Sequence, residues 1–298
     1  MSSVSAHEER EKQSAALTSL LAAVGLTAFK IVVGIVTGSL GILAEAAHSG
    51  LDLVAAGMTL VAVRISGRPA DSSHLYGHGK IENLSAMGET LLLLVTCGWI
   101  VWEALHRLLF HSVEIQVTIW SFAVMLTSIA IDVSRSRVLA RAARKFKSQA
   151  LEADALHFQT DVWSSAVVVL GLVAVKIGEW YPRLAFLSGA DAVAALVVSV
   201  LVVWVSAQLG RRTIDALMDR APEGMEERIL AAVEAVPGVH NCHNLRMRYS
   251  GPVLFIDLHV LMDGAQSLSE AHQLTETVEQ AIQQLAPQAD VTVHAEPF

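Results

Sequence analysis

The sequence predicts an α-helical membrane protein with six transmembrane helices, followed by a small C-terminal α+β domain in the cytoplasm. Of its 298 residues 53% are hydrophobic and only 17% are charged, with a mean hydropathy of +0.48. A soluble domain carries about 25% charged residues, so this deficit is typical of a chain that spans a bilayer. After Arg211 the pattern changes to alternating apolar and polar residues with turn signals. We therefore expect a tail at 1–13, a transmembrane domain at 14–211 and a cytoplasmic domain at 212–298.

Each apolar stretch in the first two thirds of the chain predicts one spanning helix. About 20 apolar residues cross the hydrocarbon of a bilayer, and most of the stretches approach that length. The fourth is the shortest, and we expect its helix to continue through the basic segment that follows. The six stretches are 15–36, 40–63, 86–109, 117–133, 150–177 and 190–209.

The basic residues predict which side of the membrane each loop occupies. Lys and Arg concentrate in cytoplasmic loops, and here they cluster after the second, fourth and sixth stretches. Both termini are then cytoplasmic, and a bacterial inner membrane suits the short loops. The formal charge of −8 says little about nucleic acid, but the clustering beside spans is typical of membrane topology rather than of phosphate binding, so we expect no nucleic-acid partner. The clustered residues are Arg64, Arg68 and Lys80; Arg135, Arg137, Arg141, Arg144, Lys145 and Lys147; and Arg211 and Arg212.

Two identical spacings inside apolar stretches predict a metal site within the membrane. They are His48-x-x-x-Asp52 in the second stretch and His157-x-x-x-Asp161 in the fifth. Residues four apart lie on one face of a helix, so each helix offers an imidazole and a carboxylate together. Ionisable residues in a bilayer are costly and usually functional. Two imidazoles with two carboxylates suit tetrahedral Zn²⁺, and they also suit Fe²⁺, Co²⁺ or Cd²⁺.

The predicted depths of the two pairs agree. With a rise of 1.5 Å per residue, Asp52 lies about 18 Å from Arg64, and His157 lies about 15 Å from Lys147. The two helices run in opposite directions, so each histidine is level with the other helix's aspartate. The other ionisable residues within spans are expected to pack helices or to line a cavity rather than to bind metal. They are Lys30, Glu45, Glu89, Glu103 and Asp132.

The pattern after residue 225 predicts the order helix, strand, strand, helix, strand. An amphipathic helix over 226–235 ends at Pro237 and Gly238, and two alternating strands over 243–249 and 253–261 flank a turn. A second helix from about 269, with Ser267 or Ser269 as N-cap, precedes a last strand over 290–294. Neither Cys97 nor Cys242 has a spacing that indicates a disulfide or a cysteine metal motif.

The chain resembles the cation diffusion facilitator family of metal–proton antiporters from about residue 15 onward. The resemblance rests on three motifs: residues 38–52 with Glu45, His48 and Asp52; the loop Tyr76-Gly77-His78-Gly79-Lys80; and His157-Phe158-Gln159-Thr160-Asp161. It implies six spans and a ferredoxin-like cytoplasmic domain that forms a homodimer. It also implies that His48, Asp52, His157 and Asp161 bind the transported ion, and that a His–Asp set on both helices carries Zn²⁺ out in exchange for H⁺.

The resemblance further implies two peripheral metal sites and one interdomain charge pair. Asp71, His74 and His78 match a loop metal site of some members, although a solvated polar loop explains them equally well. The pair is Lys80 with Asp219. In members with a binuclear zinc site in the cytoplasmic domain, the last ligand is typically Asp, where this chain has Glu. The matching positions here are His243, His259, His272, His294 and Glu296.

Three other functions are alternatives to zinc export. Export of Fe²⁺, Mn²⁺, Co²⁺ or Cd²⁺ keeps the scaffold and changes only the ion. A membrane-anchored metal sensor does not need ligands at the middle of the bilayer. An intramembrane metalloenzyme is disfavoured because the chain has no His-Glu-x-x-His motif, and we expect the protein not to be an enzyme.

Overall fold

The computed structural model describes residues 3–110, 119–180 and 190–298 and divides the chain into two compact units. The first unit contains Met1–Arg68 and Ile81–Thr213, and the second contains Pro69–Lys80 and Ile214–Phe298. The loop before the third helix thus belongs with the C-terminal unit, although the helices on both sides of it belong to the bundle.

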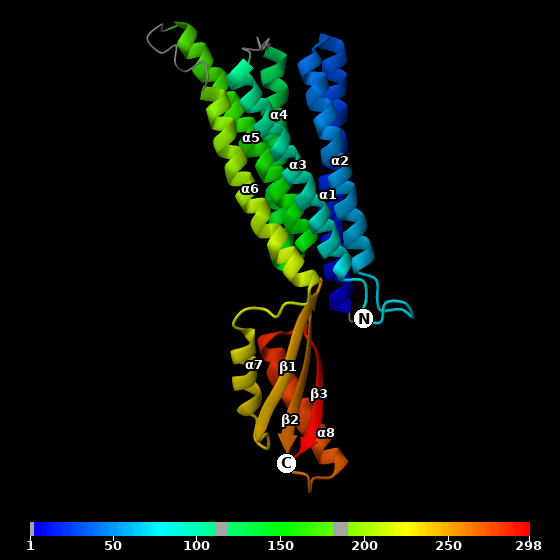
Figure 1. Cartoon of the computed structure of the whole chain (residues 1–298). Helices are drawn as coiled ribbons and strands as arrows, with labels where there is room; N and C mark the ends of the chain where they lie inside the picture. Colours follow the sequence, from blue (N-terminus) through cyan, green and yellow to red (C-terminus); the bar gives the residue numbers. More distant parts are fainter. Residues whose placement is uncertain (1–2, 111–118, 181–189) are drawn as a thin grey trace. The chain divides into compact units, whose positions relative to one another are not determined.

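Six long helices form the first unit, and they run side by side in Figure 1. Its fourth helix continues through the basic segment, as expected, while residues 117 and 118 of the predicted fourth span lie outside the described residues. The helices are α1 (Ser3–Thr37), α2 (Leu40–Ser66), α3 (Lys80–Phe110), α4 (Ile119–Phe146), α5 (Gln149–Trp180) and α6 (Ala190–Leu217).

A tight turn reverses the chain between α1 and α2. Gly38 has a φ of +66°, which glycine adopts without the steric cost that a side chain brings. The next residue, Ser39, caps α2 by accepting a hydrogen bond from the backbone N–H of Ile42. The reversal places α2 beside α1, and α2 carries His48 and Asp52.

Small and branched side chains hold α1, α2, α4 and α5 together. One buried cluster joins Ala16, Leu60, Leu139, Leu151 and Phe158 from these four helices. Small residues allow helices to approach closely in a membrane, where apolar burial alone drives little association. Many large apolar side chains on the outside of the bundle remain exposed, as expected for a surface that faces lipid.

A test of length and hydropathy on the described residues finds two helices apolar enough to cross a membrane. They are His7–Thr37 and Glu45–Ser66, whose best windows have mean hydropathies of 2.2 and 1.4. The second of these carries His48 and Asp52, so the polar pair lies within an apolar span.

The C-terminal unit has the αββαβ order that the sequence predicts. It contains α7 (Met225–Glu234), β1 (Asn241–Ser250), β2 (Val253–Met262), α8 (Leu268–Leu285) and β3 (Asp290–Pro297). The sheet order is β1-β2-β3, with β1 antiparallel and β3 parallel to β2. Buried residues of α7 and α8 form one core with alternate residues of β2, so both helices cover the same face of the sheet.

Candidate metal centres

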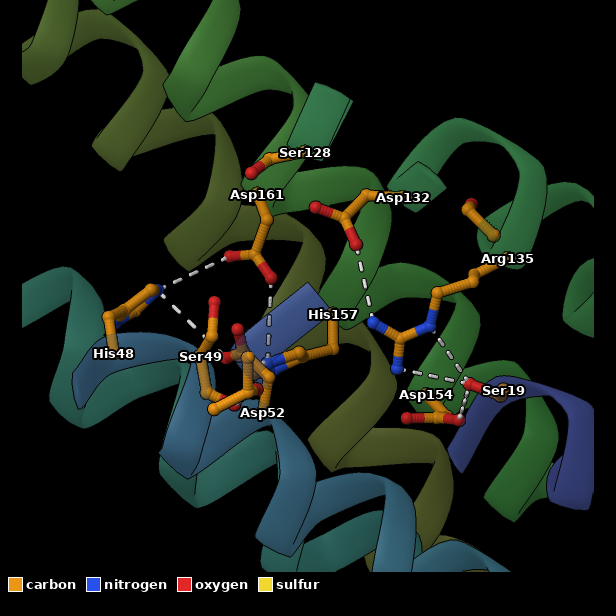
Figure 2. A network of polar contacts seen from close by, with 12 residues as sticks. Ser19, His48, Ser49, Asp52, Ser128, Asp132, Arg135, Asp154, His157 and Asp161 are labelled. Carbon is orange, nitrogen blue, oxygen red and sulfur yellow. Dashed lines mark hydrogen bonds and ion pairs between the residues drawn. The ribbon is translucent and has the colours of Figure 1, made fainter. Parts of the chain in front are cut away.

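The two predicted pairs on α2 and α5 come together in the bundle. His157 Nε2 lies 3.2 Å from Asp52 Oδ1 and 3.7 Å from Asp161 Oδ2. His48 Nε2 lies 3.9 Å from Asp52 Oδ1 and 3.9 Å from Asp161 Oδ1. Figure 2 shows the four side chains pointing toward one another from the two helices. Each carboxylate thus contacts both imidazoles, in the arrangement expected of a four-donor site.

The four side chains differ strongly in exposure. His157 is 2% exposed and Asp52 12%, whereas His48 is 39% exposed. Donor atoms of His48, Asp52 and Asp161 all lie within 4.8 Å of one another, and His157 joins them through its contacts with both carboxylates. One wall of the site is therefore deeply buried and the wall at His48 is open. Two nitrogen and two oxygen donors fit a divalent transition metal such as Zn²⁺.

A second polar network lies beside this site, and it contains Arg135. Arg135 lies in the basic part of α4, where the helix was expected to continue, but it is only 5% exposed, which the sequence did not predict. Its guanidinium contacts Asp132 at 3.3 Å and donates to Ser19 Oγ (Figure 2). It also covers the Phe158 ring, with 3.4 Å between the guanidinium carbon and the ring centroid. Ser19 lies on α1 and Phe158 on α5, so the local basic pattern could not predict that Arg135 is buried.

Other ionisable residues of the spans take structural partners. Lys30 is 4% exposed and contacts Glu45 at 3.2 Å and Ser49 Oγ at 2.7 Å. Lys30 thus ties α1 to α2 next to His48, in the packing role expected of it. The side chain of Glu103 lies outside the described residues.

The loop before α3 brings its three metal-ligand types together. Asp71 lies 3.4 Å from His74 Nδ1 and 3.4 Å from His78 Nε2, and the three donor atoms lie within 4.8 Å. Asp71 also accepts hydrogen bonds from the backbone N–H groups of His74 and Ser73, which lower the pKa of its carboxyl. The carboxylate is therefore held ionised between two imidazoles, and this donor set fits a metal ion.

The sheet of the C-terminal unit aligns three histidines in one row. His243 pairs with His259 across β1 and β2, and His259 pairs with His294 across β2 and β3. The row lies on the face opposite the core, because the neighbouring residues of β2 are the buried ones. Residues two apart on a strand share a face, so Glu296 stands beside His294. The register therefore assembles a site that the order of residues only suggested.

Glu296 links this row of histidines. Its carboxylate lies 2.8 Å from His259 Nδ1, 3.1 Å from His243 Nε2 and 3.7 Å from His294 Nε2. The hydrogen bond with His259, followed by the charges of the nearby histidines, lowers the pKa of Glu296. The fifth predicted residue, His272, does not join them within one chain, and its contact is Glu276 on α8, at 3.5 Å. Three histidines and a glutamate thus form the set that this chain brings together.

The predicted charge pair forms within the C-terminal unit and has further partners. Lys80 Nζ lies 2.7 Å from Asp219 Oδ1, and Arg248 lies 3.4 Å from Asp219 Oδ2. The Arg248 guanidinium also lies 4.4 Å from the Tyr76 ring centroid, and Tyr76 meets Phe255 edge-on at 5.4 Å. The loop is therefore fixed to the sheet by ion pairs and stacking together. We did not predict Tyr76 or Arg248, because nothing local connects residues so far apart in sequence.

Two family models together match nearly the whole chain. Residues 16–218 match the model described as cation efflux transmembrane domain, and residues 221–298 match the cation efflux protein cytoplasmic domain, named ZT_dimer. Both matches cover the segments that carry the candidate metal centres.

Curated proteins with the same extent are similar to this chain. A protein named Cation-efflux pump FieF from Serratia proteamaculans is 36% identical over 96% of this chain and 92% of its own length. Its namesake from Cronobacter sakazakii is 35% identical over 95% of this chain and 92% of its own length. Metal tolerance protein C1 from Arabidopsis thaliana is 34% identical over 93% of this chain and 61% of its own length.

Proposed function

Since the chain belongs to the cation efflux family of membrane metal transporters, the cation diffusion facilitators, we propose that it exports Zn²⁺ from the cytoplasm in exchange for H⁺. The family comprises transporters and not enzymes, so the candidate centres serve binding and transport. The zinc ion is the cargo of the site between α2 and α5. One observation carries the proposal: two imidazoles and two carboxylates converge inside the bundle with donor contacts of 3.2 to 3.9 Å.

The donor set supports the coupling to protons. Imidazole binds metal in its neutral form and carboxylate in its ionised form, so metal and protons compete for the same groups. Metal that leaves on the outer side frees His48, His157 and the two aspartates to accept protons. A change of access then exposes the protonated site to the cytoplasm, where incoming metal displaces the protons. The exposed side chain of His48 and the buried one of His157 give the site one open and one closed wall.

Export of another divalent ion is the second candidate. Sites built of imidazole and carboxylate also accept Fe²⁺, Co²⁺ and Cd²⁺, and carboxylates suit Mn²⁺. The relatives are named for cation efflux and metal tolerance, which does not decide among these ions.

We further propose a membrane location, an oligomeric state and two resident metal sites for the transporter. The protein lies in the bacterial inner membrane with both termini in the cytoplasm, with the tail, transmembrane domain and cytoplasmic domain divided at residues 13 and 211. It forms a homodimer, supported by the match to the model named ZT_dimer. His243, His259, His294 and Glu296 hold a resident Zn²⁺, to which His272 contributes in the dimer. Asp71, His74 and His78 hold another.

Uptake into proteoliposomes tests the central proposal. Wild-type protein under a pH gradient should move Zn²⁺ and protons in opposite directions. The fluxes of Fe²⁺, Mn²⁺, Co²⁺ and Cd²⁺, each offered separately, are compared with that of Zn²⁺. Asp161→Ala should abolish the flux because both histidines lose a shared partner. The control is Asp215→Asn, an exposed residue paired with Arg220. Zn²⁺ flux at the wild-type rate in Asp161→Ala would refute the site, and metal binding without flux would refute transport.

A further inference from the structure

His157 is the most deeply buried of the four proposed ligands of the transported ion, and polar partners lie on one side of its ring. Its Nε2 lies 3.2 Å from Asp52 and 3.7 Å from Asp161, and its side chain is 2% exposed. Its Nδ1 is buried and has no hydrogen-bond partner among the described residues. A histidine that binds metal usually donates its second ring N–H to a carboxylate or a carbonyl, which fixes the orientation of the ring. Since Nδ1 of His157 lacks such a bond in the described chain, the orientation of this ring depends on packing.

The Phe158 ring packs against the His157 ring. The two rings are nearly perpendicular, at 87°, and their centroids lie 5.3 Å apart, which is a preferred geometry for aromatic pairs. Phe158 is 0% exposed and belongs to the buried cluster that joins α1, α2, α4 and α5. Side chains in a close-packed interior have little room to rotate. The position of the Phe158 ring therefore limits the orientations that are open to the His157 ring.

Arg135 on α4 holds the Phe158 ring in turn. Its guanidinium carbon lies 3.4 Å from the ring centroid, so the cation covers one face of the ring. Its Nε and Nη2 donate to Ser19 Oγ at 3.3 and 3.2 Å, and its Nη1 donates to Asp132 at 3.3 Å. Figure 2 shows these partners of Arg135 next to the transport site. Because the guanidinium is planar, contacts of three of its nitrogens fix the plane that lies over the ring.

Arg135 also ties α4 to α1 through Ser19, so a purely structural role is the alternative. The next residue on α4, Ser136, separates the two roles. Its hydroxyl donates to the Ala155 carbonyl at 3.0 Å, a buried bond between α4 and α5 that involves no ring. Loss of the Ser136 bond changes only the packing of α4 against α5, whereas loss of Arg135 also releases Phe158.

We propose that Arg135 and Phe158 are positioning residues for the metal ligand His157, arranged as a stack of guanidinium, phenyl ring and imidazole. This inference rests on the proposed zinc transport and names two residues outside the four ligands that set the affinity of the site. Zn²⁺ in a tetrahedral site bonds imidazole nitrogen at about 2.0–2.1 Å, so a displaced ring weakens its binding. Mn²⁺ prefers oxygen ligands, so its binding depends less on the ring. The stack therefore favours Zn²⁺ over Mn²⁺ at this site.

The test measures Zn²⁺ and Mn²⁺ binding by calorimetry in the full-length protein with Asp71→Ala and His259→Ala, which remove a ligand from each peripheral site. Phe158→Leu takes away the ring and keeps an apolar side chain. We expect its Zn²⁺ affinity to fall about 10-fold, the scale on which altered partners of a ligand act, and its Mn²⁺ affinity to fall less. Phe158→Tyr keeps the ring and should bind Zn²⁺ more tightly than Phe158→Leu. In proteoliposomes Phe158→Leu should raise KM for Zn²⁺, whereas a loss of folded protein lowers only the maximal rate.

Two further variants separate positioning from structure. Arg135→Lys keeps the positive charge but has no planar group to cover Phe158, so its Zn²⁺ affinity should fall as well. Ser136→Ala is the matched control and should keep the wild-type affinity for both ions. Wild-type Zn²⁺ affinity in Phe158→Leu and Arg135→Lys would overturn the inference, as would equal losses for Zn²⁺ and Mn²⁺ or an equal loss in Ser136→Ala. Wild-type protein that binds Zn²⁺ without transporting it would instead overturn the proposed function, because affinity is measured without flux.

Discussion

Glu296 shows how one side chain can organise a site across a sheet. Its two oxygens contact His243 and His259 at 3.1 and 2.8 Å, on strands β1 and β2, while Glu296 itself lies on β3. An aspartate at this position has one methylene less and cannot keep both contacts without moving the strand. The side chain of Glu296 is therefore long enough to contact His243 on β1 and His259 on β2 from its position on β3.

We predict that Glu296→Asp and Glu296→Gln both weaken Zn²⁺ binding at the histidine row. Aspartate loses reach and glutamine loses charge, and each change should lower the affinity by at least about 10-fold, the scale on which altered metal-site partners act. Binding would be measured by calorimetry in an Asp52→Ala/Asp161→Ala background, which silences the transport site. Glu227→Gln, an exposed residue of α7, is the control. An affinity in Glu296→Asp equal to wild type would show that the reach of Glu296 is not needed.

At the scale of elements, α8 is held by a capping box at its first turn. Ser267 accepts from the backbone N–H of Glu270, and the Glu270 carboxylate accepts from the backbone N–H of Ser267. The hydrogen bonds from Ser267 lower the pKa of Glu270. The capping box positions the start of a helix whose Val278 and Ile282 fill the core of the C-terminal unit.

We predict that Ser267→Ala destabilises α8 by about 1 kcal/mol, because the backbone N–H of Glu270 loses the hydroxyl that accepts its hydrogen bond. Hydrogen exchange of the full-length protein should show faster exchange in the first turns of α8. Thr277→Ala is the control, since its hydroxyl bonds only to the Gln273 carbonyl of the same helix and alanine is a better helix former. Equal protection of α8 in Ser267→Ala and wild type would exclude a stabilising cap.

The elements also show what the sequence could predict. Capping residues, the i, i+4 pairs and strand alternation act within a few residues, so the order of the C-terminal elements and the His48–Asp52 face were predictable. The environment of Arg135 depends on Ser19 and Phe158, which only the packing of α1 and α5 brings near. The row of histidines likewise depends on strand register, which follows from pairing across the sheet.

At the scale of the whole molecule, residues 69–80 join the two units. They lie between α2 and α3 in the chain but belong with the C-terminal unit. Gly79 lies so close to Ser250 and Gly251 that a Cβ added to Gly79 would clash with the Ser250 carbonyl oxygen. The loop also carries Asp71, His74 and His78, so the contacts that fix it to the C-terminal unit also hold this candidate metal centre.

We predict that the Lys80–Asp219 pair fixes this loop throughout the physiological pH range. The hydrogen bond from Lys80, together with the charge of Arg248, lowers the pKa of Asp219 below its ordinary value of 3.8. A carboxyl with a lowered pKa stabilises the fold above that ordinary value and loses its contribution only as pH falls through the folded pKa, here below 3.8. Protection of residues 69–80 against hydrogen exchange, corrected for intrinsic rates, should therefore be constant between about pH 8 and 5 in wild type.

Asp219→Asn should lower the protection of residues 69–80 at every pH in that range. The exchanged pair Lys80→Asp/Asp219→Lys should not restore it, because the new lysine would face Arg248, and Asp215→Asn serves as the control. Loss of protection in wild type between pH 8 and 6, or full rescue by the exchanged pair, would show that another contact fixes the loop.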